Sequence, residues 1–162
     1  MRRALSPLTV TLMLLAAAPF CVAGSADGFG YDKCPVCGAF VYKHPEKAAF
    51  IYYEKSGKMR YLAFDGAADM MKFYLEPNRW GDFGNIKMHI LKIVVRDHSS
   101  KKPILAKRAW YVYIAAPGKK GLKVELVPFE TKQAAEEFKD SRNGKIVLRF
   151  GEISKRVLYA EE

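Results

Sequence analysis

Two stretches of this chain repeat one order of apolar runs, turns and amphipathic segments. Each begins with an aromatic strand-like run, passes through a Gly/Lys-rich turn into a second strand-like run, and ends in a segment with helical periodicity. In chain order these segments are 50–53, 56–58, 59–65 and 67–75 in the first stretch, and 110–114, 117–121, 122–130 and 131–140 in the second. The pattern predicts a β-hairpin followed by a helix, twice.

The spacing within the two stretches also agrees. In each, a Phe at the end of the second run is followed nine positions later by a Phe in the helical segment; the two pairs are Phe64 with Phe73 and Phe129 with Phe138. A third strand-like run follows each helix, at 86–95 and at 145–150. Each helix has a candidate N-cap, Asp65 or Thr131, whose side-chain oxygen can accept a hydrogen bond from a free backbone N–H group.

We therefore expect an α+β protein made of two similar ββαβ units. The boundary falls near residues 97–103, which divides the mature chain into residues 24–97 and 98–162. Isolated units of roughly 60–70 residues would be only marginally stable, so the two should share an interface. Whether they form two small lobes or one pseudo-symmetric sheet stays open at this point. Met70 and Met71 are expected to belong to the core.

The first 23 residues have the composition of a secretory signal peptide. Two arginines supply the positive start, the apolar stretch 8–20 follows, and small residues permit cleavage after Ala23 or Ala26. This stretch is shorter than the about 20 residues that a transmembrane helix needs, and no later segment replaces it. We therefore expect export to a periplasm without a transmembrane segment. Cys21 is the candidate for a lipid anchor, which the bulky Phe20 before it disfavours.

The charge of the chain bears on its partners. The formal net charge is +10, and it falls to +8 when the signal peptide leaves with its two arginines. The lysines are dispersed rather than gathered in one run, and an exported protein rarely meets nucleic acid, so we expect no nucleic-acid partner. A solvated basic face accounts for the charge, and docking onto an acidic partner or anionic lipid is the functional alternative.

The candidate chemistry lies in Cys34-Pro-Val-Cys37-Gly38. A C-x-x-C pair can chelate one soft metal ion, because the turn between the cysteines brings both sulfurs to one side. Gly38 allows a tight bend immediately afterwards. A structural zinc site would need two further ligands, and the chain has no second C-x-x-C and no paired histidine motif.

Three other interpretations compete with zinc. A thioredoxin-type motif should follow a buried strand and open a helix, whereas no strand precedes Cys34 and the residues after Cys37 favour an extended conformation. An ordinary disulfide suits an oxidising compartment, although so short a loop gains little stability from closure. Cu(I) prefers thiolate and thioether ligands and accepts two- or three-coordination, so a lone C-x-x-C with one extra Met or His suffices. The residues favour Cu(I).

Four ordered motifs, spread over the mature chain, are similar to those of a known family. They are Cys34-Pro-Val-Cys37-Gly38 followed by Phe40-Val41, Phe64-Asp65-Gly66 with Asp69-Met70, Glu125-Leu-Val-Pro-Phe129, and Gly144-Lys-Ile-Val-Leu-Arg-Phe150 before Glu152-Ile153. With these motifs the chain resembles the NosL family, copper-accessory lipoproteins associated with nitrous oxide reductase.

The resemblance implies a periplasmic Cu(I) chaperone, built from two similar α+β units, that hands copper to a client such as nitrous oxide reductase. Cys37 matches the cysteine of the family's Cys-Gly-Met element, and Cys34 matches the cysteine that often precedes it. Two thioethers typical of the family are absent here. Ala39 stands where Met follows Cys-Gly, and Lys119-Lys120 stands in the hairpin that usually reads Gly-Pro-Met-Gly.

A third copper ligand would therefore come from elsewhere in the chain. Met59, just after the first hairpin turn, and His98, at the start of the second half, are the candidates. His98 lies at roughly the place in the second half that the thiols occupy in the first. A packing role for Met59 and an exposed loop position for His98 are the ordinary alternatives.

Two hypotheses about function follow. The first is a non-enzymatic metallochaperone that carries Cu(I) on Cys34 and Cys37 to a periplasmic copper enzyme. The second is a periplasmic scaffold that has lost copper delivery and acts as a redox or interaction module with a Cys34–Cys37 disulfide. An enzyme is not expected, because the chain contains no Ser/His/Asp arrangement, no phosphate-binding loop and no carboxylate dyad.

Overall fold

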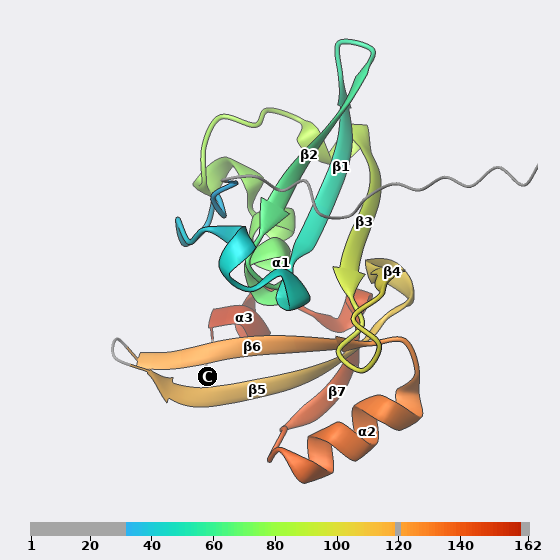
Figure 1. Cartoon of the computed structure of the whole chain (residues 1–162). Helices are drawn as coiled ribbons and strands as arrows, with labels where there is room; N and C mark the ends of the chain where they lie inside the picture. Colours follow the sequence, from blue (N-terminus) through green and yellow to red (C-terminus); the bar gives the residue numbers. More distant parts are fainter. Residues whose placement is uncertain (1–31, 119–120, 160–162) are drawn as a thin grey trace, which may run out of the picture.

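The computed structural model describes residues 32–118 and 121–159, which form two antiparallel sheets (Figure 1). The expected signal peptide, residues 1–23, lies outside the described residues, as does Cys21. None of the helices in the described part of the chain is long and apolar enough to cross a membrane.

The first sheet has four strands in the order β2-β1-β3-β4. Their bounds are β1 (Ala49–Lys55), β2 (Lys58–Phe64), β3 (Ile90–Arg96) and β4 (Pro103–Leu105). Helix α1 (Ala67–Leu75) connects β2 to β3. More than half of the circumference of this helix is buried; the buried residues are Ala67, Ala68, Met70, Met71 and Phe73.

The second sheet has three strands in the order β6-β5-β7. Its elements are β5 (Trp110–Gly118), β6 (Gly121–Phe129), α2 (Lys132–Ser141) and β7 (Ile146–Arg149). In both sheets the second hairpin strand lies at an edge, and the strand after the helix pairs with the other side of the first strand. The predicted pair of ββαβ units is thus confirmed, as two sheets rather than one.

Short helical turns join these elements. They are η1 (Val41–Lys43), η2 (Pro45–Lys47), η3 (Pro77–Arg79), η4 (Ile86–His89), η5 (Ala106–Arg108), η6 (Phe150–Glu152) and α3 (Lys155–Tyr159). The strand expected at 86–95 therefore begins only at Ile90. In η4 a single residue, Ile86, is buried, and one 3₁₀ turn lets the three that follow face solvent.

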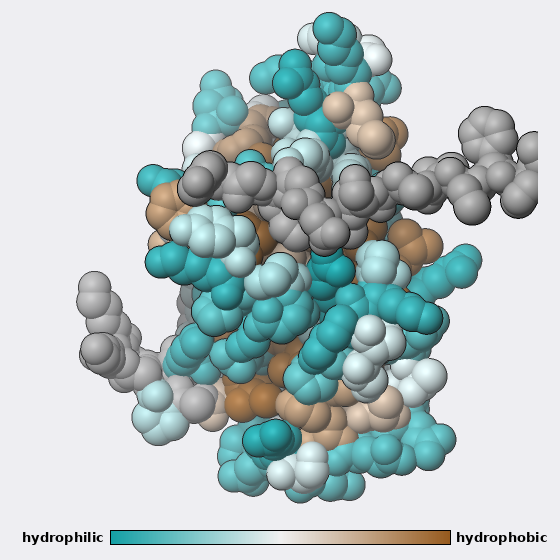
Figure 2. All heavy atoms as spheres, viewed as in Figure 1, coloured by the Kyte–Doolittle hydropathy of each residue, from teal (hydrophilic) through white to brown (hydrophobic). Residues whose placement is uncertain are grey.

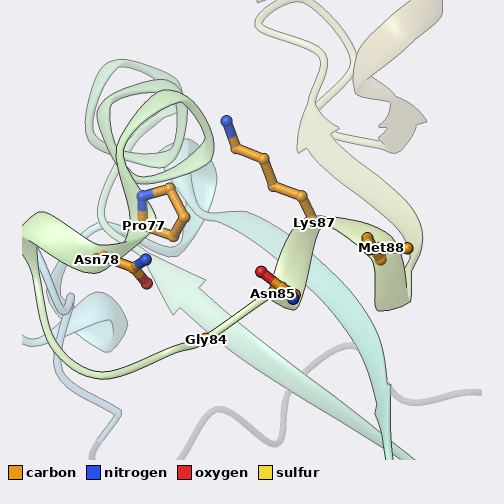
Figure 3. A pocket seen from close by; sticks show the side chains of 6 residues that line it. All are labelled: Pro77, Asn78, Gly84, Asn85, Lys87 and Met88. Carbon is orange, nitrogen blue, oxygen red and sulfur yellow. The ribbon is translucent and has the colours of Figure 1, made fainter.

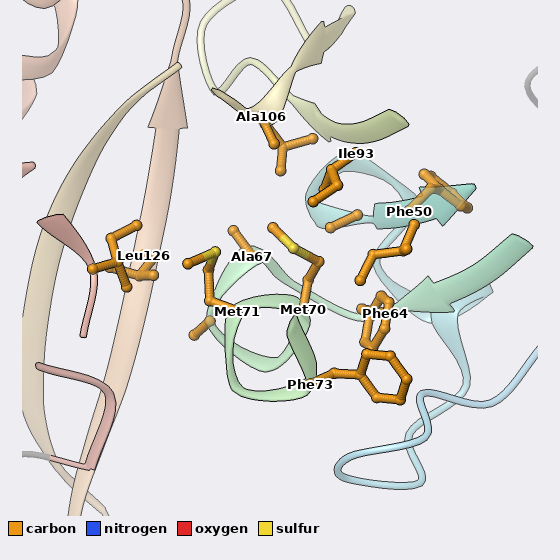
Figure 4. Packing of buried hydrophobic residues seen from close by; sticks show 14 of the residues in the cluster. Phe50, Phe64, Ala67, Met70, Met71, Phe73, Ile93, Ala106 and Leu126 are labelled. Carbon is orange, nitrogen blue, oxygen red and sulfur yellow. The ribbon is translucent and has the colours of Figure 1, made fainter. Parts of the chain in front are cut away.

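One hydrophobic core extends through both halves. Helix α1 lies between the two sheets, with Met70 directed toward Ile93 of β3 and Met71 toward Leu126 of β6 (Figure 4). Both methionines are buried in this core, as the sequence predicted. The shared core supplies the expected interface between two units that would each be only marginally stable alone. A smaller cluster lies beneath α2 on the outer face of the second sheet.

The two helices begin differently. Thr131 caps α2, because its Oγ1 accepts a hydrogen bond from the Ala134 N–H at 3.3 Å, as predicted. Helix α1 has Gly66 as its N-cap residue and no side-chain cap, so the cap predicted at Asp65 is wrong. The Asp65 carboxylate instead faces the thiols.

The surface agrees with the basic composition. In the view of Figure 2 hydrophilic residues predominate, and apolar residues appear in small separate patches. Scattered apolar residues of this kind are ordinary on protein surfaces and do not by themselves mark an interface.

Candidate metal centre

Cys34 and Cys37 lie in a tight turn, residues 34–39, which we call the thiol turn. The Cys34 N–H donates to the Ala39 carbonyl at 2.8 Å, and the Gly38 N–H donates to the Cys34 carbonyl at 2.9 Å. These two hydrogen bonds close the turn from both ends. The backbone therefore holds the two cysteines on one side before any metal binds.

Gly38 has the positive φ of 73° that closes the thiol turn. No atom lies within 4 Å of the position that a Cβ would take. Gly38→Ala should therefore lower the free energy of unfolding only through backbone strain, by about 1–2 kcal/mol. Chemical denaturation of both proteins measures this, with Gly151→Ala, also open around its Cβ position but without a positive φ, as the control. Equal losses in the two variants would contradict the assignment of strain to Gly38.

Two carboxylates complete the site. One ligand atom from each of Cys34, Cys37, Asp65 and Asp69 lies within 4.8 Å of every other. Asp65 directly follows β2, and Asp69 lies in the first turn of α1. Packing of the thiol turn against the β2–α1 junction thus brings together side chains 28 to 35 positions apart in the sequence.

The spacing of the four donors suits one metal ion. Two metal–sulfur bonds of about 2.3 Å place the sulfurs at most about 4.6 Å apart, close to the 4.8 Å limit of the cluster. Both cysteines are free thiols in the structure. A small change in side-chain torsion would therefore let both sulfurs bind the same ion.

The two thiols differ in access. Cys34 is 1% exposed, whereas Cys37 is exposed at the surface although its Sγ faces the cluster. Burial raises the pKa of both thiols, and the neighbouring Asp69 carboxylate raises both further, since a negative charge disfavours a thiolate beside it. Both are consequently protonated at neutral pH until a metal displaces the protons.

The surroundings orient Cys34 and Asp69. Backbone N–H groups of Cys37, Asp65 and Val36 are directed at the Cys34 sulfur and oppose part of the rise in its pKa. The Cys34 thiol donates toward Asp69 Oδ2 at 3.8 Å, while the Lys72 ammonium binds Asp69 Oδ1 at 3.1 Å. Lys72 therefore fixes the carboxylate in place and offsets its charge.

The structure does not bring Met59 to the thiols. Met59 pairs with Glu54 near the hairpin end of β2, and its side chain is 64% exposed. Asp65, beside the thiols, follows the opposite end of that strand. Six residues of extended chain at about 3.3 Å each place Met59 about 20 Å from Asp65, beyond the reach of a shared ion.

His98 likewise lies apart from the thiols. Its ring packs on Phe129 and Phe138, with centroid distances of 5.4 and 4.7 Å, in the second half of the chain. Burial against these rings lowers the pKa of His98, as does the nearby Lys101 ammonium. Among the described residues, the cluster that contains Cys34 and Cys37 includes no histidine.

Asp65 and Asp69 are the site residues that the sequence did not assign. Both stand in the Phe64-Asp65-Gly66 and Asp69-Met70 motifs, where the sequence indicated a helix start. Their position in motifs that resemble those of the family was the signal that could have pointed to them. Nothing local to the sequence, however, places the start of α1 against the thiol turn.

A hollow of about 250 Å³ lies elsewhere, between η3 and η4 (Figure 3). Its lining residues are Pro77, Asn78, Gly84, Asn85, Lys87 and Met88. They include no thiol, carboxylate or imidazole, and the Lys87 ammonium is engaged with the Leu75 carbonyl at 3.0 Å. The Met88 thioether is the one soft metal donor among these lining residues, too few for a metal site.

Two thiols and two carboxylates around one point define a candidate metal site, carried here on a duplicated α+β scaffold. The model of the NosL family matches residues 30–158, and the chain belongs to that family. A similar solved structure is the copper chaperone NosL from Shewanella denitrificans, at 25% sequence identity and a TM-score of 0.53. The match covers 76% of this chain and 90% of that one. No curated protein sequence matches the chain.

Proposed function

We propose that this NosL-family protein is a non-enzymatic metallochaperone that carries Cu(I) on Cys34 and Cys37 in the periplasm. The observation that carries the proposal is the cluster of both thiols with Asp65 and Asp69, preformed at the surface end of the thiol turn. The similar Shewanella protein is a copper chaperone, which supports copper as the cargo. The signal-like residues 1–23 support export.

The donor set suits Cu(I) through its sulfurs. Thiolates are soft ligands that select Cu(I), and two of them suffice for a two-coordinate ion. Asp65 and Asp69 are hard donors, so we assign them to the surroundings of the copper rather than to its bonds. The Asp69 carboxylate raises the pKa of both thiols and so keeps them protonated while the site is empty.

The unequal exposure of the thiols suits delivery. An acceptor ligand can approach the copper from the side of Cys37, which is exposed, while Cys34 remains buried and bound. The ion then passes through a shared three-coordinate arrangement in which one new bond forms as the Cys37 bond breaks. The client is a periplasmic copper enzyme, and the family resemblance points to nitrous oxide reductase.

An anaerobic Cu(I) titration tests the proposal. The reduced mature protein, titrated against a chromogenic chelator, should bind close to one copper per chain, and Cys34→Ser/Cys37→Ser should lose at least about 1,000-fold in affinity, about 4 kcal/mol. Met59→Ala and His98→Ala are matched controls that should bind as the unaltered protein does. Weak binding shared by the unaltered protein and all three variants would contradict the proposal. It would favour a scaffold that carries no copper.

A further inference from the structure

The second half contains a turn with the backbone hydrogen bonds of the thiol turn. Cys34 N–H donates to the carbonyl five positions later, Ala39, at 2.8 Å. In the same way Asp97 N–H donates to the carbonyl five positions later, Lys102, at 2.9 Å. We call residues 97–102 the Asp97 turn. Cys34 and Asp97 hold the same position in their respective turns.

The closing bond and the backbone strain recur as well. Gly38 N–H donates to the carbonyl of the first residue of the thiol turn at 2.9 Å, and Lys101 N–H does the same in the Asp97 turn at 2.8 Å. Both donors have positive φ, 73° at Gly38 and 61° at Lys101. Since non-glycine residues rarely adopt this conformation, its recurrence at the matching position is specific.

The strand pairs that flank the turns agree in register. An antiparallel bridge joins Lys33 to Phe40 across the thiol turn, and the β3–β4 pair joins Arg96 to Pro103 across the Asp97 turn. Both members shift by the same sixty-three positions, as does Cys34 relative to Asp97. The whole turn is therefore duplicated, including its entry and exit.

The side chains at the matching positions accept the same amides. Asp97 Oδ2 accepts from the N–H three positions later, Ser100, at 2.6 Å, and Oδ1 accepts from Glu130, which directly follows β6, at 2.8 Å. The Cys34 sulfur likewise faces the N–H three positions later and that of Asp65, which directly follows β2. Two amides at equivalent positions thus donate to a carboxylate in the second half and to a thiol in the first.

We infer that the Asp97 turn is a second copy of the thiol turn, in which Asp97 and Ser100 occupy the positions of Cys34 and Cys37. Cysteines at positions 97 and 100 would therefore give the Asp97 turn a thiolate Cu(I) site. The inference rests on the proposed function for the nature of the ion. In the natural chain, the Asp97 carboxylate stands where the thiol turn has the Cys34 sulfur, and it connects the Asp97 turn to the end of β6. Asp97 is 3% exposed, and both its oxygens are taken by amides.

The test is Asp97→Cys/Ser100→Cys in the Cys34→Ser/Cys37→Ser background, titrated anaerobically with Cu(I) against a chromogenic chelator. We expect about one copper per chain to be regained, at an affinity within about tenfold of the natural site, because the same backbone orients the same ligands. With Cys34 and Cys37 retained, the stoichiometry should rise from one copper to two. A folded variant that binds no copper would overturn the inference.

A shifted cysteine pair is the matched control. Ser99→Cys/Lys102→Cys adds the same two thiols at the same C-x-x-C spacing, two positions out of register with the amides of Ser100 and Glu130. It should bind Cu(I) at least about tenfold more weakly, because its sulfurs are not preorganised. Equal affinities of the two pairs would show that spacing alone suffices, which overturns the equivalence of the turns.

The reverse exchange, of second-half residues into the thiol turn, gives a test that needs no copper. Cys34→Asp/Cys37→Ser/Asp69→Ala places the residues of the second half in the first. Asp69 becomes alanine because it is the third residue of α1, and the third residue of α2 is Ala134. It should melt several degrees above Cys34→Ala/Cys37→Ser/Asp69→Ala, because the carboxylate accepts the amides of Cys37 and Asp65. An equal or lower melting temperature overturns the inference even if the cysteine pair at 97 and 100 fails to fold. Weak copper binding by the natural chain would count against the proposed function alone.

Discussion

Asp97→Ala is expected to lower the free energy of unfolding by about 3–5 kcal/mol, since two amide hydrogen bonds to a charged, buried acceptor are lost. The part-buried amides of Ser100 and Glu130 would lose their acceptor. Because Glu130 follows β6 while Asp97 follows β3, the loss also loosens the connection between the halves. The melting temperature should fall by about 10–15 °C, which calorimetry of the reduced protein measures.

The effect of Asp97 should depend on pH. Burial raises the pKa of this carboxyl, but the amide hydrogen bonds of Ser100 and Glu130 outweigh burial and hold it below its usual range. A lowered pKa in the folded state means that the stabilisation is fully present above the unfolded-state pKa and is lost as the pH falls through the folded-state pKa. The difference between the natural protein and Asp97→Ala should therefore be constant from pH 5 to 7 and shrink below pH 4.

Two variants control for this prediction. Asp82→Ala removes an exposed carboxylate and should change stability by no more than about 0.5 kcal/mol. Asp97→Asn keeps one acceptor but turns an N–H₂ group toward the second amide, so it should be destabilised as well. If Asp97→Ala unfolds with the same free energy as Asp82→Ala, the carboxylate does not tie the turn to β6.

Cu(I) affinity should rise about 100-fold per pH unit between pH 6 and pH 8, because two protons leave for each copper bound. The pKa values of Cys34 and Cys37 are both raised above the ordinary thiol value, first by burial and then by the Asp69 carboxylate. Both thiols are therefore protonated throughout this range, and protons compete with copper at both sulfurs. Chelator competition at several pH values, corrected for the chelator's own protonation, measures the slope.

Asp69→Asn is the informative comparison for the slope. Removing this negative charge lowers the pKa of both thiols, so the pH at which the slope begins to level off should move downward. Direct titration of the thiolate absorbance should shift in the same direction. A slope of tenfold per pH unit in the natural protein would mean that one sulfur is already a thiolate, contrary to the raised pKa values.

The architecture could be predicted from the sequence because its signals are local. Alternating apolar residues mark the strands, helical spacing marks α1 at 67–75 as observed, and Thr131 is a usable cap because its partner lies three residues away. The two ββαβ units repeat these signals, so the duplication could be predicted from the sequence alone. The boundary of a strand was harder to predict, since β3 begins at Ile90, four residues later than expected, after η4.

The thiol pair was equally visible, while its surroundings were not. Asp65 reads as a helix cap in the sequence, and only the packing of α1 and β2 against the thiol turn directs it to the sulfurs. Met59 and His98 were chosen for their chemistry and for their places in the repeat. The length of β2 and the aromatic packing of His98 keep both away from the thiols.

By itself, then, the sequence determined the order of elements, the core positions and the presence of two closely spaced thiols, all of which depend on neighbours within one turn or strand. Only the tertiary structure decided which carboxylates face those thiols, and that Asp97 takes the place of a cysteine in the second half. The physical reason is the same in both cases. Side chains that lie far apart along the chain meet through the packing of one element on another. The spacing of residues in the sequence does not predict that packing.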